Sequence, residues 1–107
     1  MVIEAIPGIS AEISVALQHV FSHFANIETV RLFGSRAKKS FKSGSDIDLA
    51  VFAPMMSDAE FNAMWDQVDA LPIIFKIDLL HWDRLTNQAL KEKVLAEGHI
   101  LYRGRAV

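Results

Sequence analysis

Residues 31–52 read RLFGSRAKKSFKSGSDIDLAVF, two short apolar segments separated by a polar, basic one. The first apolar segment extends back to residue 28 and predicts a strand over residues 28–33 that ends at Gly34. The second predicts a strand over residues 45–53, in which Asp46 and Asp48 share one face because side chains alternate along a strand. The opposite face of that strand is apolar and consists of Ile47, Leu49 and Val51.

Helix signals flank this stretch. Apolar residues at helical spacing predict a helix over residues 11–25. Ser57 and Glu60 form the pattern of a capping box that opens a second helix. Residues 35–44 predict one helical turn followed by a loop.

The last third of the chain predicts one more strand and one more helix. Residues 73–82 are mostly apolar and predict a strand. Asp83 is placed to cap a final helix that Gly98 closes, and residues 99–102 predict a short extended end. We therefore expect one α/β (α+β) domain over residues 1–107, with a small mixed sheet of three to four strands flanked by helices.

Composition limits the class of protein. Of the 107 residues, 51% are hydrophobic and 22% are charged, which is typical of a globular domain. The chain has no cysteine, which excludes disulfides, thiolate catalysis and cysteine-ligated metal sites. No apolar run is long enough for a membrane span and the N-terminus has no export signal, so we expect a cytoplasmic protein.

Charge is distributed unevenly, although the formal net charge is only −2. One window contains five basic residues and no acidic one: Arg31, Arg36, Lys38, Lys39 and Lys42. Such a cluster is usually a solvated loop, and the alternative is an anion site beside the acidic residues that follow. A surface for RNA or DNA is a minor alternative, because the overall charge balance is acidic.

Three aspartates point to a metal site: Asp46, Asp48 and Asp78, the last in the strand predicted over residues 73–82. Asp46 and Asp48 would lie about 7 Å apart, where two like charges repel by about 2.5 kcal/mol at an effective dielectric near 20. This repulsion does not help a fold unless a cation neutralises it. Carboxylate oxygens suit Mg²⁺ shared with substrate phosphates, and two such ions can stabilise the attacking and leaving oxygens of a phosphoryl-type transfer.

The residues after the first strand suit a phosphate. Gly34 lacks a Cβ and lets an anion approach the backbone closely. Ser35 opens a helical turn with its hydroxyl and free N–H groups, and Arg36 adds positive charge. The pattern is neither a Walker-type loop nor a dinucleotide fingerprint.

Taken together, these residues resemble the signature of the DNA polymerase β-type nucleotidyltransferases, G-S-x10-D-x-D, and with the later Asp most resemble the minimal nucleotidyltransferase (MNT) proteins. The resemblance covers residues 28–102 and implies the nucleotidyltransferase fold. It implies that Gly34 and Ser35 hold the β- and γ-phosphates of a nucleoside triphosphate, with ATP the expected one, and that Asp46 and Asp48 bind the metals. Asp78 would bind a metal and help to activate an acceptor hydroxyl as AMP is transferred.

Larger members of this superfamily carry further helices or a second domain that holds nucleotide and acceptor. Minimal members pair instead with a helical protein of the HEPN type, an RNase toxin whose tyrosine receives AMP. The resemblance thus implies an antitoxin with a helical partner. An exposed apolar patch is expected where the further domain of larger members would dock, so we expect self-association or a heteromer. The competing hypothesis is a non-catalytic module that binds nucleotide or blocks its partner by contact.

Other residues that could carry chemistry have simpler interpretations. His19 and His23 are four residues apart on the predicted first helix, but no third metal ligand accompanies them, so we expect surface histidines. We expect His81 and His99 to be structural or exposed, and Ser45 to belong to a turn. The aromatic residues expected in the core or at an interface are Trp65, Trp82 and Tyr102.

Overall fold

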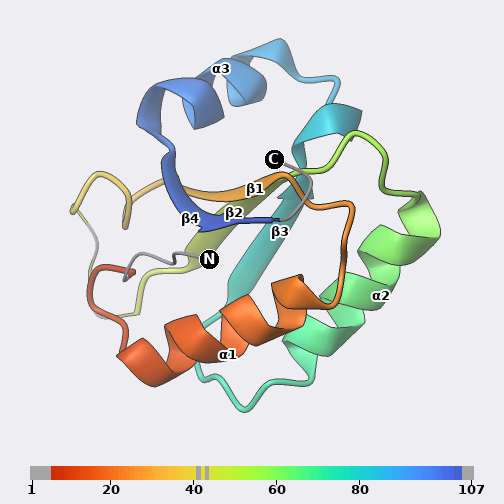
Figure 1. Cartoon of the computed structure of the whole chain (residues 1–107). Helices are drawn as coiled ribbons and strands as arrows, with labels where there is room; N and C mark the ends of the chain where they lie inside the picture. Colours follow the sequence, from red (N-terminus) through yellow and green to blue (C-terminus); the bar gives the residue numbers. More distant parts are fainter. Residues whose placement is uncertain (1–5, 41, 43, 105–107) are drawn as a thin grey trace.

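The computed structural model describes residues 6–40, 42 and 44–104 of the chain. Three α-helices and four strands follow one another along this part of the sequence (Figure 1). The helices are α1 (Ala11–Ser22), α2 (Asp58–Asp69) and α3 (Gln88–Glu97), and a short 3-10 helix, η1, spans Trp82–Arg84. The strands are β1 (Thr29–Phe33), β2 (Ile47–Phe52), β3 (Ile77–His81) and β4 (His99–Arg103).

The four strands form one mixed sheet in the order β3-β2-β1-β4. β1 is antiparallel to both β2 and β4, whereas β2 and β3 are parallel. A parallel pair needs a crossover connection, and α2 provides it. The expected α/β domain with a small mixed sheet is confirmed, with four strands.

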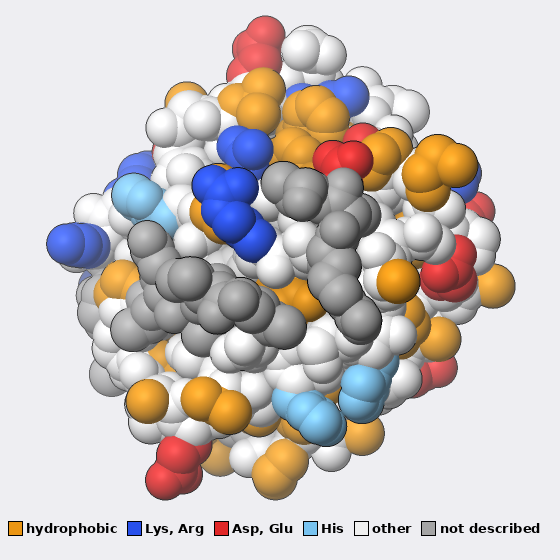
Figure 2. All heavy atoms as spheres, in the orientation of Figure 1, with side chains coloured by type: hydrophobic (Ala, Val, Ile, Leu, Met, Phe, Trp, Pro, Cys, Tyr) orange, Lys and Arg blue, Asp and Glu red, His pale blue; other side chains and the backbone are white. Residues whose placement is uncertain are grey.

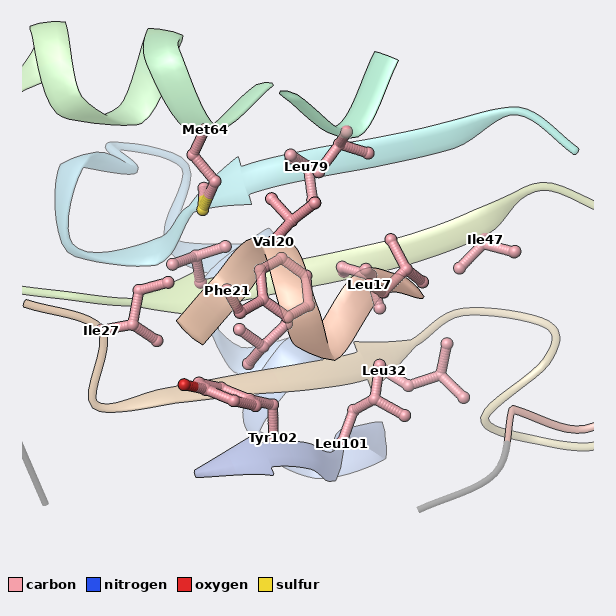
Figure 3. Packing of buried hydrophobic residues seen from close by; sticks show 14 of the residues in the cluster. Leu17, Val20, Phe21, Ile27, Leu32, Ile47, Met64, Leu79, Leu101 and Tyr102 are labelled. Atoms are coloured by element: carbon pink, nitrogen blue, oxygen red, sulfur yellow. The ribbon is translucent and has the colours of Figure 1, made fainter. Parts of the chain in front are cut away.

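The main core lies between one face of the sheet and the helices α1 and α2. Figure 3 shows Leu17, Val20 and Phe21 of α1 reaching toward the strands, with Met64 of α2 beside them. The Phe21 and Tyr102 rings lie 5.5 Å apart between centroids. The predicted apolar face of β2 belongs to this core, since Ile47, Leu49 and Val51 are fully buried.

α3 covers the opposite face of the sheet (Figure 1), and a second, smaller cluster of buried residues lies there. Val94 of α3 packs there with Phe33 of β1 and with Ala50 and Phe52 of β2. Side chains alternate along β2, so Asp48 lies on the face of Ala50. The acidic residues of the strands therefore share the α3 side of the sheet.

Local signals for the helix ends are confirmed in two places. The Ser57 side chain accepts from the Glu60 N–H, and the Glu60 side chain accepts from the Ser57 N–H, which completes the predicted capping box. Gly98 is the C-cap residue of α3. The first helix ends at Ser22, three residues before its predicted end.

Two predictions for the last third of the chain were wrong in detail. The strand begins at Ile77, not at residue 73, because Ile73 and Phe75 pack against the main core from a loop. Asp83 does not cap α3; its carboxylate accepts from the Ala53 N–H at 2.8 Å. The cap is Asn87, whose side chain accepts from the Leu90 N–H.

Figure 2 shows hydrophobic side chains scattered among polar ones over the face that carries α1. None of the helices within the described residues has the length and apolar character that crossing a membrane requires.

Candidate functional site

Gly34 directly follows β1 and lies beside Asp48 of β2. Phe33, the last residue of β1, is the register partner of Asp48. Gly34 has a φ of +79°, which L side chains rarely adopt, and a Cβ there would collide with the Asp48 carboxylate. The position therefore requires glycine, and the turn that follows β1 lies directly beside Asp48.

The turn after Gly34 is a single helical turn, as predicted. The Lys38 N–H donates to the Gly34 carbonyl at 3.2 Å, and the Ser40 N–H donates to the Ser35 carbonyl at 3.0 Å. Ser35 is half-buried and adjoins the glycine that contacts Asp48. Gly34 and Ser35 thus lie next to one of the candidate metal-binding carboxylates.

Arg36 does not lie where a phosphate could use it, which contradicts the prediction for this residue. Its side chain is buried, with 1% of its surface exposed. The guanidinium donates to the Pro7 carbonyl at 2.8 Å and to the Ser45 carbonyl at 2.9 and 3.2 Å. These hydrogen bonds hold the Arg36 side chain in the protein interior. They satisfy the buried charge, which would otherwise be costly to remove from water.

Asp48 and Asp78 lie on neighbouring strands at the same level of the sheet. They are register partners in the parallel β2–β3 ladder. Their neighbours Leu49 and Leu79 belong to the core under α1 and α2, so the two carboxylates are directed to the opposite face. The structure therefore brings together two of the three predicted aspartates.

The electrostatics of the site link all three aspartates. Burial raises the pKa of Asp48 above its usual value, and the negative charges of Asp78 and Asp46 raise it further, whereas Lys93 and Lys76 lower it. Lys76 Nζ lies 3.8 Å from Asp78 Oδ1. The site is thus a concentration of negative charge that two lysines partly offset.

Asp48 and Asp78 can supply two ligands to a hard divalent cation, but the carboxylates do not surround the ion. Asp46 is exposed and directly precedes β2. Among the described residues, no three carboxylate or imidazole groups are gathered closely enough to hold an ion by themselves. Mg²⁺ usually takes one or two carboxylates together with waters and substrate phosphates, and Asp48 with Asp78 supplies that donor set.

A hollow of about 290 Å³ lies beside Asp78 at the β3 edge of the sheet. Most of its lining is apolar and comes from α2 and the loop that leads to β3. Lining residues include Trp65, Leu71, Ile73, Phe75, Lys76 and Asp78. Ile74, between two of these in the chain, has 93% of its surface exposed.

A comparison with protein families identifies the chain. The family model "Polymerase beta, Nucleotidyltransferase" matches residues 16–105. The chain belongs to the polymerase beta nucleotidyltransferase family. The predicted class of enzyme, a nucleotidyltransferase, is therefore confirmed.

Solved structures share the fold of this nucleotidyltransferase at low sequence identity. A toxin–antitoxin with AMP-PNP matches with a TM-score of 0.66 and 20% identity, over 91% of this chain and 76% of that chain. A mutant of the toxin–antitoxin MntA–HpeT matches with a TM-score of 0.63 and 18% identity, over 91% and 75%. A Sulfolobus solfataricus protein assigned to the nucleotidyltransferases matches with a TM-score of 0.55 and 22% identity, over 84% and 76%. No curated protein sequence matches the chain.

The histidines of this nucleotidyltransferase lie outside the carboxylate site, as expected. His19 and His23 are exposed on and just after α1, and histidine side chains are visible at that surface in Figure 2. The ring of His81 is buried and hydrogen-bonded to the Ala53 carbonyl at 2.8 Å, whereas His99 is exposed and its ring is hydrogen-bonded to the Ala37 carbonyl at 3.1 Å. Ser45 has the expected turn role, since its hydroxyl accepts from the Lys42 N–H.

Sequence reasoning missed the two lysines of the site. Lys76 stands two residues before Asp78, and this alternation in a strand could have indicated it. Lys93 lies on α3, 45 positions after Asp48, and no local pattern connects the two. Only the packing of α3 over the acidic face of the sheet brings Lys93 near Asp48.

Proposed function

We propose that this nucleotidyltransferase uses ATP and Mg²⁺ to transfer AMP to a tyrosine of a helical HEPN-type partner, and that it acts as the antitoxin of that partner. The observation that carries the proposal is the pairing of Asp48 with Asp78 beside Gly34. Family membership supports nucleotidyl transfer. The fold shared with toxin–antitoxin structures, one of them with AMP-PNP, supports the nucleotide and the partner.

Each residue of the site has a role in this proposal. Gly34 and Ser35 hold the triphosphate, because the turn presents backbone N–H groups next to a position without a Cβ. Asp48 and Asp78 would hold Mg²⁺ together with the phosphates, and we assign Asp46, exposed just before β2, as the third carboxylate near the ion; the ion would neutralise charge that develops on the phosphoryl oxygens. Lys76 and Lys93 offset the remaining negative charge of the carboxylates.

The transfer exchanges one bond to phosphorus for another. The tyrosine oxygen forms a bond to the α-phosphorus, the bond from that phosphorus to the bridging oxygen breaks, and pyrophosphate leaves. Asp78 orients the hydroxyl and accepts its proton. Catalysis of this kind depends on positioning and electrostatic stabilisation.

The hollow beside Asp78 is the place we assign to the acceptor. Its apolar lining suits an aromatic side chain, and Asp78 is among its lining residues at the β3 edge, around which the hydroxyl would reach the carboxylate on the α3 side. The exposed side chain of Ile74 extends the apolar surface outward, where a protein partner could cover it.

The test is transfer of label from α-labelled ATP to the helical partner in the presence of Mg²⁺. We expect labelled partner with the wild-type chain and a loss of at least about 100-fold with Asp46→Asn, since the substitution removes one charged donor. Glu92→Gln, which neutralises an exposed acid on α3, is the matched control and keeps full transfer. Absence of transfer by the wild-type chain, or full transfer by Asp46→Asn, contradicts the proposal.

The second candidate is a module that neutralises its partner by contact alone. It is favoured by the lack of a closed three-carboxylate ligand set among the described residues. A chain with all three aspartates changed to asparagine separates the two functions. If it still neutralises the partner, contact alone is sufficient; if neutralisation is lost while the complex still forms, transfer is required.

A further inference from the structure

Arg36 lies in the turn after Gly34, and its side chain contacts both segments that lead to the acidic residues. Its guanidinium donates to the Ser45 carbonyl through Nε at 3.2 Å and through Nη2 at 2.9 Å. Ser45 immediately precedes Asp46. The backbone that carries Asp46 and leads into β2, where Asp48 lies, is therefore held by a side chain from the turn after Gly34.

The same guanidinium also contacts the segment before Asp78. Arg36 Cζ lies 5.1 Å from the centroid of the Phe75 ring, within the range of a cation–π contact. The two segments are joined to each other as well, since the Ile47 N–H donates to the Lys76 carbonyl at 2.9 Å. A third bond, to the Pro7 carbonyl at 2.8 Å, ties Arg36 to the residues before α1.

Packing alone does not explain an arginine at this position. A buried charge is costly, and apolar residues of similar volume often replace buried charges without loss of stability. A guanidinium, however, offers several N–H donors in a rigid plane and stacks on an aromatic ring at the same time, which neither lysine nor an apolar residue can do. The bonds of Arg36 use this geometry to join separate loops.

We propose that Arg36 is a positioning residue, which sets the spacing between the segments that carry Asp46 and Asp78 and thereby shapes the metal and nucleotide site. This role deepens the proposed function and rests on it. It assigns Arg36 no contact with substrate. Loss of the bridge should loosen the two loops while the centre of the sheet stays intact.

The test compares Arg36→Lys with Arg31→Lys. Lysine keeps the charge but cannot bridge the Ser45 and Pro7 carbonyls while covering the Phe75 ring. Arg31 is a suitable control, because its guanidinium also lies over a ring, that of Phe52 at 4.4 Å, but in the middle of β1. Both substitutions thus remove an arginine–aromatic contact, and only one removes the bridge.

Two measurements are made on each variant. The first is hydrogen exchange of the Ile47 amide relative to the amides of the β1–β2 ladder, without metal or nucleotide. In Arg36→Lys we expect Ile47 to exchange about tenfold faster with the ladder unchanged, the effect of losing about one charged hydrogen bond. The second is the affinity for AMP-PNP with Mg²⁺, which we expect to fall about tenfold in Arg36→Lys and less than twofold in Arg31→Lys.

The outcomes separate this inference from the proposed function. If the wild-type chain does not bind AMP-PNP with Mg²⁺, the proposed function fails, and the exchange pattern still decides the role of Arg36. Equal acceleration of all amides in Arg36→Lys, or no change at Ile47, overturns the inference. If Arg36→Lys does not fold, Phe75→Leu replaces it: faster exchange confined to Ile47 and β3 supports the bridge, and an unchanged pattern overturns it.

Discussion

Replacing Asp48 with asparagine should stabilise the fold while it destroys activity. Asp48 and Asp78 are register partners on adjacent strands, which lie about 4.8 Å apart. Two charges about 5 Å apart repel by about 3 kcal/mol at an effective dielectric of 20. The Asp78 side chain is 38% exposed and Lys76 lies 3.8 Å from it, so screening reduces the net repulsion to about 1 kcal/mol.

The raised pKa of Asp48 determines how the stability gain of Asp48→Asn changes with pH. The pKa of Asp48 is raised in the folded chain from 3.8, so the folded state keeps its proton at a pH where the unfolded state has lost it. The stability of the wild-type chain therefore falls as pH rises through the folded pKa, because the folded state binds more protons there. The advantage of Asp48→Asn should grow as pH rises above about 3.8 and should vanish well below that pH, where the carboxyl is neutral in both states.

Thermal unfolding at low ionic strength measures the effect. A gain of about 1 kcal/mol raises the midpoint of a domain of this size by about 5 °C. Glu92→Gln serves as the control, with an expected change within about 0.5 kcal/mol. A lower midpoint for Asp48→Asn at pH 7, or the same gain at pH 3, would show that Asp48 is not under electrostatic strain from its neighbours.

Three further substitutions test other parts of the structure. Gly34→Ala should lower the unfolding free energy by at least about 1–2 kcal/mol in urea denaturation, because of the positive φ and the collision with Asp48; an unchanged value would show that the turn can relax. Ser57→Ala should cost about 1 kcal/mol in the same measurement, because it removes the capping-box acceptor, whereas Ser57→Asn, which keeps an acceptor, should cost less. Ile74→Asp should weaken binding of the helical partner about tenfold without affecting AMP-PNP affinity, whereas Met55→Asp, at a residue that is 79% exposed, should leave partner binding unchanged. Equal effects of the two substitutions would show that the partner does not bind at the hollow.

The parts of the fold that depend on residues close in sequence were predictable. The alternation of side chains around Asp48 identified β2, and the Ser57–Glu60 pattern identified the start of α2, each to within a few residues. Both signals arise from residues close together in the chain. The start of β3 was not predictable in this way. A short apolar run such as residues 73–75 is equally compatible with a strand and with a loop that covers a core, and only the packing of Ile73 and Phe75 against the main core distinguishes the two.

The candidate site shows the same division. Gly34 and the Asp48–Asp78 pair could be anticipated, because they follow from strand ends and strand periodicity. Arg36 was assigned to phosphate because it follows Gly34 and Ser35, yet its partner carbonyl on Pro7 is 29 positions away in the chain. A side chain long enough to turn either outward or inward takes its direction from partners that no local pattern contains.

The acidic face and the apolar core are two sides of the same strands, and this explains how the fold tolerates its charges. Ile47 and Leu49, on either side of Asp48, are fully buried against α1 and α2. Burial of two such side chains contributes about 3–6 kcal/mol, more than the repulsion of about 1 kcal/mol on the other face. The core therefore fixes the β2–β3 register that holds Asp48 beside Asp78, and the carboxylates stay close without stabilising each other. Such a pair is poised to gain free energy from a cation, because any positive charge that reaches it relieves a repulsion that the core maintains.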